Sequence, residues 1–354
     1  MADAPAPILI DHTHCGRHVT GLERITQELF SREALAPLAV DMVTAASRRQ
    51  MLLRQSFGLP WAALRARRAI IVTPGFPPSP FLTLFGARVL PYIHDLFLIT
   101  RQQDLNLRAK LYMAPPFRFA VTRLPRFLVN SLHTRDELRR FCREDAEIIP
   151  YRPGVRNVFG LSAQGRAERD VTQRTLRLIA LGTVEPRKNL LAAAAILSAL
   201  RARHFPDATL DIVGRIGWGP DADVLRNSPG VTLHGYQSSE AGRALIEAAD
   251  LYITTAHDEG LGLPLLEVQY AGLPVIAPDK TVFREVLADT GLLLPDVSAQ
   301  AQADRIAQMV QQPGWRAQQA QGAAANLARW NEVAVRDKAS VIALLAQLSG
   351  TVVA

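Results

Sequence analysis

The stretch DEGLGLPLLEVQYAGLPVIA (258–277) directly follows an apolar run, LYITT (251–255), whose composition is typical of a buried β-strand. Gly260 and Gly262 allow the loop to adopt positive φ angles and let a ligand approach the backbone closely. Pro264 suits the first turn of a helix. A strand, a glycine-containing loop and a helix in this order predict an anion-binding site at the carboxyl end of a parallel strand.

Similar strand patterns recur along the whole chain and alternate with helical patterns, which is typical of βαβ units and a parallel sheet. The predicted strands of the first half are 7–11, 69–73, 89–94, 126–130 and 147–150. Those of the second half are 175–182, 209–214, 231–235, 251–255, 274–277 and 291–294. Two successive sets predict two doubly wound, Rossmann-like domains.

The chain length of 354 residues fits two domains of similar size. We predict a first domain over 1–155 and a second over 156–330, with a helix at about 331–354 that packs back on the first domain. Open parallel sheets bind ligands at the carboxyl ends of their strands, so the expected active site is a central cleft that the two domains face.

Carboxylates and cations gather around the expected loops. Glu259 and Glu267 lie eight positions apart, so one can reach a sugar hydroxyl while the other reaches a ribose. In GTVEPRKNL (182–190), Arg187 and Lys188 lie between a strand end and a helix start, where they would supply positive charge for a pyrophosphate.

These residues resemble the E-x7-E signature of retaining GT-B glycosyltransferases of glycosyltransferase family 4. The resemblance implies that Glu267 holds the ribose, and that Glu259 and the loop amides up to Gly262 orient the donor sugar. It implies donor contacts from Gly182, Arg187, Lys188, Gly260, Leu261 and Leu263. Many members carry an arginine where this chain has Thr183, so we expect Arg187 to take the role of that arginine.

Weaker matches extend the resemblance to other strand ends. The segment 19–30 resembles the glycine-containing loop of the family's N-terminal domain, which places Gly21 near the donor phosphates. His94 would lie beside the transferred sugar and the acceptor as a catalytic residue, together with Glu259, Arg187 and Lys188. Arg215 and Tyr236 would neighbour the nucleobase, which the sequence leaves open between uracil and guanine.

Positive charge is concentrated in the first half of the chain. Residues 1–155 hold 21 Lys and Arg against 13 Asp and Glu, a balance of +8, and the remainder holds 19 against 20, a balance of −1. Such a surface suits anionic lipid headgroups or an acidic acceptor, or is solvated without a partner. No nucleic-acid-binding motif accompanies it, so we expect no nucleic acid partner.

Several classes of site and location are disfavoured. No apolar run is long enough to span a membrane, and the first residues lack a signal-peptide pattern, so we expect a cytoplasmic protein, peripheral at the inner face of the cytoplasmic membrane where the basic surface docks. Cys15 and Cys142 match no metal spacing. Asp221 and Asp223 form a D-x-D pattern in an expected surface loop without a preceding strand, so we predict no metal site and no cofactor besides the donor.

The sequence therefore predicts a metal-independent hexosyltransferase, and the family resemblance implies that it retains the anomeric configuration. It would move a hexose or deoxyhexose from a UDP- or GDP-linked donor to a glycan or lipid-linked glycan, in cell-surface polysaccharide assembly. The first domain would bind the acceptor and the second the donor. Two alternatives stay open: a GT-B enzyme of other chemistry, such as a nucleotide-sugar epimerase or a phosphorylase, and a non-catalytic binding protein.

Overall fold

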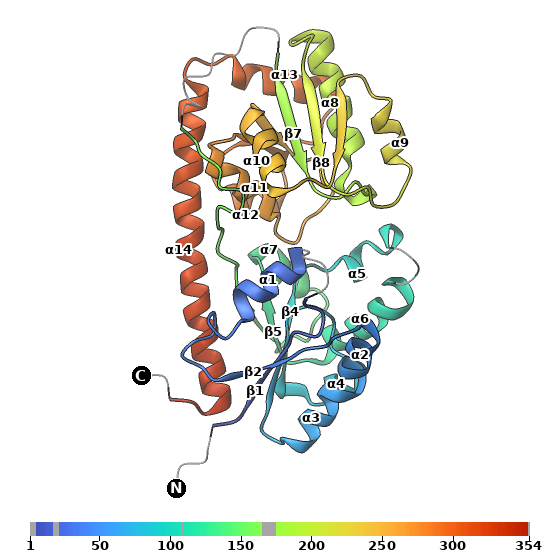
Figure 1. Ribbon diagram of the computed structural model, residues 1–354, viewed down its shortest axis with the longest axis vertical. Helices are drawn as coiled ribbons and strands as arrows, with labels where there is room; N and C mark the ends of the chain where they lie inside the picture. Colours follow the sequence, from blue (N-terminus) through green and yellow to red (C-terminus); the bar gives the residue numbers. More distant parts are fainter. Residues whose placement is uncertain (1–4, 17–20, 106, 108, 165–174, 353–354) are drawn as a thin grey trace. The chain divides into compact units, whose positions relative to one another are not determined.

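The computed structural model describes residues 5–16, 21–105, 107, 109–164 and 175–352 (Figure 1). The chain forms two compact units, Met1–Gly154 with Glu332–Ala354, and Val155–Asn331. Each unit contains one six-stranded parallel sheet. The long helix α14 (Trp315–Ser349) contributes its residues up to Asn331 to the second unit and the following residues to the first.

The sheet of the first unit has the strand order β2-β1-β3-β4-β5-β6. Its strands are β1 (Ile8–Asp11), β2 (Val40–Val43), β3 (Ile70–Thr73), β4 (Val89–Ile93), β5 (Arg126–Val129) and β6 (Glu147–Pro150). Its helical segments are α1 (Gly21–Phe30), α2 (Arg48–Leu53), η1 (Arg54–Gly58), α3 (Leu59–Arg65), α4 (Pro80–Thr83), η2 (Gly86–Arg88), α5 (Phe97–Thr100), η3 (Gln102–Asp104), η4 (Ala109–Met113), α6 (Ala114–Arg123) and α7 (Leu132–Leu138). The strand order reverses between β1 and β3.

The sheet of the second unit has the order β12-β11-β10-β7-β8-β9. Its strands are β7 (Arg177–Leu181), β8 (Thr209–Val213), β9 (Val231–Gly235), β10 (Leu251–Ile253), β11 (Val275–Pro278) and β12 (Leu292–Leu294). Its other helical segments are η5 (Pro186–Lys188), α8 (Leu190–Arg203), α9 (Asp221–Arg226), α10 (Ser239–Ala248), α11 (Leu263–Glu267), η6 (Val268–Ala271), α12 (Thr281–Leu287) and α13 (Ala299–Val310). Here the order reverses between β7 and β10, which creates the switch point where such sheets bind ligands.

The prediction of two doubly wound parallel sheets is confirmed, and every predicted strand is present to within a few residues. The sequence prediction missed β2, which is a short edge strand with an exposed Asp41 at its second position. An edge strand is covered less completely than a central one, so its apolar pattern is weaker.

The central strands of the first sheet are fully buried, as expected for a parallel sheet. All four residues of β3 and all five of β4 are buried, because helices cover the sheet on its two faces. Phe117 of α6, Phe127 of β5 and Leu59 of α3 lie in the same apolar cluster of the first unit. Burial on both faces removes the polar alternation that an antiparallel, half-exposed strand would show.

The last part of α14 is hydrogen-bonded to other segments of the first unit. Arg152 donates from its Nε and Nη2 atoms to the carboxylate of Asp337, over 2.6 and 3.0 Å. The backbone N–H of Ala6 donates to the carbonyl of Ser349 over 2.7 Å. A bidentate, half-buried pair of this kind is stronger than a surface ion pair.

No helix in the described part of the chain combines the length and the apolar composition that crossing a bilayer requires.

Candidate active site

Two loops of the second unit meet at the carboxyl ends of neighbouring strands. β7 and β10 are paired in parallel, with Leu178 opposite Leu251 and Ile179 opposite Tyr252. The loop after β7 carries Arg187 and Lys188, and the loop after β10 carries Glu259. These loops are about 70 positions apart in the sequence, and the strand order places them side by side at the switch point.

Glu259 is the centre of the hydrogen-bond network that joins the two loops. Its carboxylate accepts from Nη1 of Arg187 over 2.9 Å and, in a short contact, from Nζ of Lys188. Arg187 also donates from Nη2 to Glu185 over 2.7 Å and from Nη1 to the carbonyl of Asp258 over 3.0 Å. Glu185 was not predicted as a site residue, although its position two residues before Arg187 could have suggested an ion pair.

The charges around Glu259 keep it ionised. Only 8% of the residue is exposed, and burial by itself would raise the pKa of its carboxyl group. Lys188 and Arg187 outweigh that effect, so the pKa lies below its usual value. Glu185 and Glu259 together balance the charges of Arg187 and Lys188. Part of the positive charge expected for a phosphate is therefore already neutralised by carboxylates of the protein.

Lys188 retains capacity for a ligand. An ammonium group has three N–H donors, and the described contacts of Lys188 use one of them, toward Glu259. Gly182, at the end of β7, has φ 135°, and a Cβ atom there would lie 3.3 Å from Cε and 3.6 Å from Nζ of Lys188. The glycine thus leaves room for the lysine side chain beside the strand end.

The loop after β10 has the geometry that its sequence predicts. Gly262 has φ 82° and directly precedes α11, with Pro264 in the first turn. Leu261 and Leu263, on either side of Gly262, are buried. α11 itself is only five residues long and continues as the 3-10 segment η6.

Glu267 lies at the end of α11 and is 6% exposed. Burial, together with the negative charges of Glu259 and Glu267, raises the pKa of the buried Tyr252 well above its usual value. The carboxylates therefore lie close enough to the end of β10 to act on the same phenol. Tyr252 was not predicted as a site neighbour, because within an apolar strand it reads as an ordinary core residue.

Arg215 and Tyr236, the predicted base neighbours, lie on the loops after the adjacent strands β8 and β9 and contact each other. The guanidinium carbon of Arg215 lies 5.1 Å from the centroid of the Tyr236 ring. Tyr236 is 73% exposed, so its ring face is open to a stacking partner. The backbone N–H of Val184 donates to the Arg215 carbonyl over 2.8 Å, which joins this loop to the one that carries Lys188.

Gly21 and His94 belong to the first unit. Gly21 begins α1, and a Cβ atom there would meet nothing within 4 Å, so packing does not require a glycine. The neighbouring residues 19 and 20 of the predicted glycine-containing segment lie outside the described residues.

His94 follows β4 and is held in one tautomer. Its Nε2 atom lies 2.7 Å from the carbonyl oxygen of Pro74, which can only accept, so Nε2 carries the proton and Nδ1 is an acceptor. Burial lowers the pKa of His94 to about 4, and His14 adds to that effect. The ring of His14 lies against Gly75, where a Cβ atom would come within 2.3 Å of it.

We predict that His94 is neutral throughout the physiological range. Because its pKa lies near 4, no titration of this imidazole should appear between about pH 5.5 and 8. Long-range ¹H–¹⁵N correlation spectra recorded across that range should show the Nε2-protonated tautomer throughout, with the resonance assigned by its loss in His94→Gln. A midpoint near pH 6.5 would contradict the prediction.

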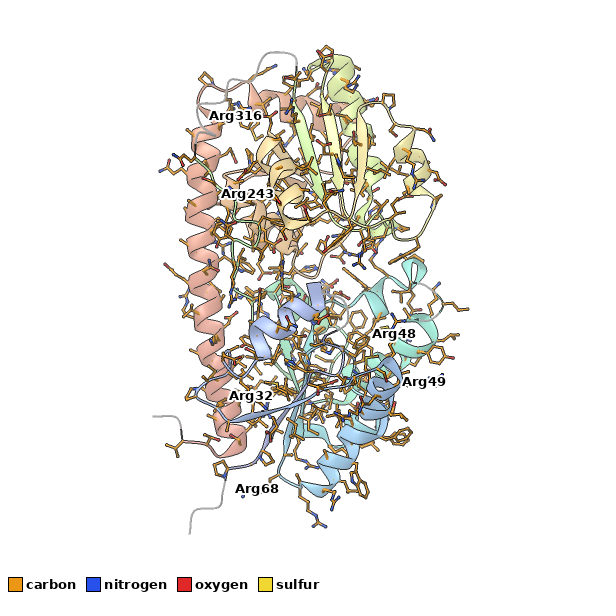
Figure 2. All side chains as sticks on the ribbon, viewed as in Figure 1. Arg32, Arg48, Arg49, Arg68, Arg243 and Arg316 are labelled. Atoms are coloured by element: carbon orange, nitrogen blue, oxygen red, sulfur yellow. The ribbon has the colours of Figure 1, made fainter. Side chains whose placement is uncertain are left out.

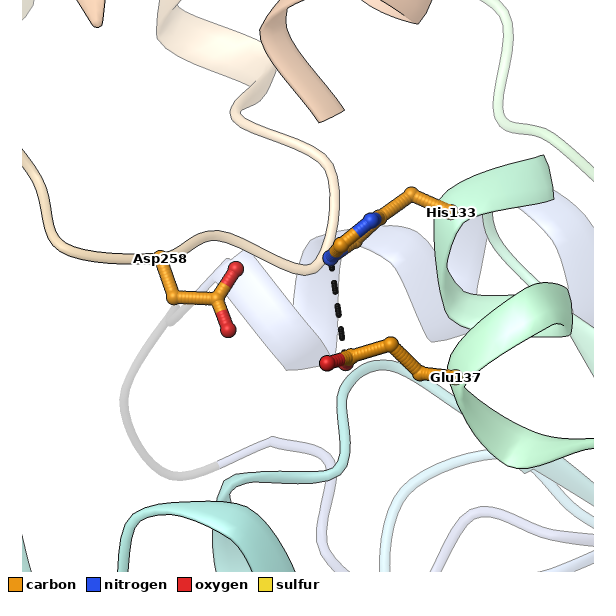
Figure 3. Close-up of side chains that lie close together, drawn as sticks. All are labelled: His133, Glu137 and Asp258. Atoms are coloured by element: carbon orange, nitrogen blue, oxygen red, sulfur yellow. Dashed lines mark ion pairs between the residues drawn. The ribbon is translucent and has the colours of Figure 1, made fainter. Parts of the chain in front are cut away.

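Two polar pairs outside the site have structural explanations. On α7, whose N-cap is Ser131, His133 and Glu137 form an i,i+4 pair with 3.7 Å between Nε2 and Oε2 (Figure 3). The D-x-D pair was expected in a surface loop, and this was wrong: Asp221 and Asp223 lie in the first turn of α9, where carboxylates stabilise the helix dipole.

Residues 166–326 match the family described as glycosyl transferases group 1. The matched range includes the two loops at the switch point. Through this domain the chain is similar to the group 1 glycosyl transferases. The GT-B fold is shown by two six-stranded parallel sheets together with solved structures: sucrose-phosphate synthase from Thermosynechococcus elongatus has a TM-score of 0.72 at 17% identity, covering 96% of this chain and 99% of that one.

Other proteins and solved structures resemble the chain as well. It is 32% identical over 184 residues to O-antigen chain mannosyltransferase B of Escherichia coli, covering 49% of this chain and 43% of that protein. It is 30% identical over 212 residues to the D-inositol 3-phosphate glycosyltransferase of Streptosporangium roseum, covering 52% and 47%. WaaG, a glycosyltransferase involved in lipopolysaccharide biosynthesis, has a TM-score of 0.65 at 17% identity, covering 96% and 99%. The chain aligns with less than half of the length of the O-antigen chain mannosyltransferase B and of the D-inositol 3-phosphate glycosyltransferase.

Proposed function

We propose that the protein transfers a hexose or deoxyhexose from a nucleoside-diphosphate sugar to a glycan or lipid-linked glycan. The observation that carries the proposal is the joining of Glu259 to Arg187 and Lys188 at the switch point of the second sheet. A diphosphate needs fixed cations, and a sugar needs a carboxylate that accepts from its hydroxyls. This cluster supplies both within one small region of the second unit.

In this proposal the donor lies across the second unit. Lys188 and Arg187 stabilise the departing diphosphate, and Glu267 accepts from the ribose hydroxyls. Glu259 and the amides of the loop from Gly260 to Gly262 orient the sugar, and Arg215 neighbours the base. His94 accepts a hydrogen bond at Nδ1 from a hydroxyl of the transferred sugar or the acceptor.

Transfer proceeds with retention of configuration and without a metal ion in this proposal. Retention follows the resemblance to glycosyltransferase family 4. The lowered pKa of Glu259 argues separately against a hydrolase-like mechanism with this residue as the general acid, because an ionised carboxylate between two cations is a poor proton donor. The two cations take the place that a divalent ion has in other sugar transferases.

The acceptor assignment rests on the relatives and on the first unit. The names of similar proteins include an O-antigen chain mannosyltransferase and a phosphatidyl-myo-inositol mannosyltransferase, which makes mannose the first donor sugar to test. A groove of about 710 Å³ in the first unit is lined by Lys110, Arg118 and Arg123 and suits a phosphate-bearing acceptor. A cytoplasmic enzyme, peripheral at the inner membrane face, would meet such acceptors in polysaccharide assembly.

The donor site is tested by calorimetric titration with UDP, GDP and ADP in the presence of EDTA. We expect micromolar binding of one nucleotide, and in Glu267→Ala a loss of about 100-fold, since a buried carboxylate that binds two ribose hydroxyls contributes about 3 kcal/mol. Glu240→Ala, an exposed glutamate of the same unit, is the matched control and should bind normally. Equal affinity in the wild type and Glu267→Ala would remove the ribose assignment.

Product analysis then separates transfer from the alternative chemistries. Incubation with the nucleotide sugar alone should leave it intact apart from slow hydrolysis, whereas an epimerase would change the sugar and a phosphorylase would require inorganic phosphate. With an acceptor, the product should carry the sugar in the donor's anomeric configuration by NMR.

A further inference from the structure

The helical stretch from Arg48 to Arg65, formed by α2, η1 and α3, has two apolar faces. It begins at Ser47, whose hydroxyl caps the backbone N–H of Gln50. One face is buried, with Leu59 and Ala63 in the core of the first unit. A surface helix normally has one apolar stripe and an opposite polar face. In this stretch the second face is apolar too, and it is exposed.

The exposed face follows helical spacing. Leu53, Phe57, Trp61 and Leu64 are separated by four, four and three positions, and each is more than half exposed. α4 packs against η1 and α3 (Figure 1), and the ring centroids of Phe57 and Phe81 lie 6.1 Å apart. With Phe81 this face forms one continuous surface, which we call the apolar ridge.

Large exposed apolar side chains are concentrated in this region. Of the nineteen in the described part of the chain, seven lie between positions 52 and 84. Scattered single exposed residues are normal on a protein surface, whereas a contiguous group with helical spacing marks an interaction surface.

The stretch of sequence that forms the ridge is rich in arginine and contains no acidic residue. Between Asp41 and Asp95 the chain has seven Arg and no Asp or Glu. Arg48 and Arg49 lie at the start of α2, and Arg68 follows the end of α3 (Figure 2). The guanidinium carbon of Arg65 lies 5.8 Å from the centroid of the Trp61 ring.

We propose that the apolar ridge docks the protein on an anionic lipid bilayer. Phe57, Trp61 and Phe81 would enter the headgroup region, where aromatic rings are favoured, while the arginines contact lipid phosphates. Weak apolar insertion and electrostatic attraction each give marginal binding, and together they hold a protein at a surface. This inference rests on the proposed location at the inner membrane face, and it does not depend on the proposed donor site.

Charge favours a bilayer over a second copy of the chain. A symmetric dimer through the ridge would place the same patch of each copy against the other. The arginines of positions 42–94 would then face one another, and these positions contain no acidic residue to separate them. Like charges across an interface are unfavourable. A lipid surface supplies the opposite charge and an apolar interior together.

Vesicle co-sedimentation with the whole protein tests the proposal. Binding to vesicles of phosphatidylcholine with about 30% phosphatidylglycerol should exceed binding to pure phosphatidylcholine by about tenfold or more. Phe57→Ser combined with Trp61→Ser should weaken binding to the anionic vesicles by about tenfold. Val224→Ser with Val335→Ser, which removes two exposed apolar side chains elsewhere, should bind like the wild type.

Fluorescence quenching reports the depth of the ridge. Trp315 and Trp330 are buried, so in a Trp218→Phe background Trp61 is the exposed tryptophan of the chain. Brominated phosphatidylcholine in anionic vesicles should quench it. Absence of quenching, or equal vesicle binding of the ridge and control variants, would overturn the proposal, as would a dimer in sedimentation velocity that the ridge substitutions abolish. None of these measurements needs a nucleotide, so failure here leaves the donor test intact.

Discussion

Replacing Lys188 by alanine should lower kcat/KM for sugar transfer by about 100- to 1,000-fold, since removing one preorganised group that stabilises transition-state charge costs about 3–4 kcal/mol. The lysine contacts Glu259, and in the proposed reaction its further N–H donors bind the departing diphosphate. The charge on that leaving group grows as the glycosidic bond breaks. Most of the loss should therefore appear in kcat and not in KM.

Two further variants separate the charge of Lys188 from its shape. Lys188→Arg keeps the charge but places a larger planar group where the lysine stem lies beside Gly182, so it should recover only part of the activity. Arg203→Ala removes a cation from an exposed pair with Asp304 in the same unit and should change the rate less than about threefold. Initial rates with a saturating acceptor provide the comparison. A rate for Lys188→Ala within threefold of wild type would contradict a role in leaving-group stabilisation.

Gly214→Ala should destabilise the second unit by about 3 kcal/mol or more, because an added Cβ atom would lie 1.9 Å from the carbonyl oxygen of Gly182. That neighbour is backbone and cannot rotate away. It is also held in place, since the Gly182 N–H donates to the Val213 carbonyl over 2.9 Å. Relief of the clash requires the ends of β7 and β8 to separate, and the loop that carries Lys188 would move with them.

Thermal unfolding followed by circular dichroism measures this loss. A change of that size should lower the unfolding midpoint by about 10 °C. Gly235→Ala is the matched control: Gly235 also ends a strand, at φ 69°, but a Cβ atom there meets nothing within 4 Å. It should cost about 1 kcal/mol for the left-handed backbone alone. Similar midpoints for the two variants would show that backbone conformation and not the close approach requires Gly214.

Much of the fold could be predicted because its signals are local. The apolar runs of the central strands reflect burial on both faces, and the glycines and Pro264 reflect backbone geometry at single positions. β2 was missed because an edge strand of four residues with an exposed Asp41 carries little of that signal. Asp221 and Asp223 were assigned to a loop because no apolar strand precedes them, and the first turn of α9 needs none.

The sequence by itself determined the class of fold, the positions of the strands and the identity of the charged residues that follow them. Only the tertiary structure decided which of those residues meet. The order β12-β11-β10-β7-β8-β9 makes β7 and β10 neighbours, so Lys188 and Arg187 contact Glu259. The physical reason is that strand neighbours are chosen by packing over the whole sheet, which no local pattern of side chains encodes. The same holds for the apolar ridge, whose residues look like core in the sequence and are exposed because Leu59 and Ala63 occupy the buried face instead.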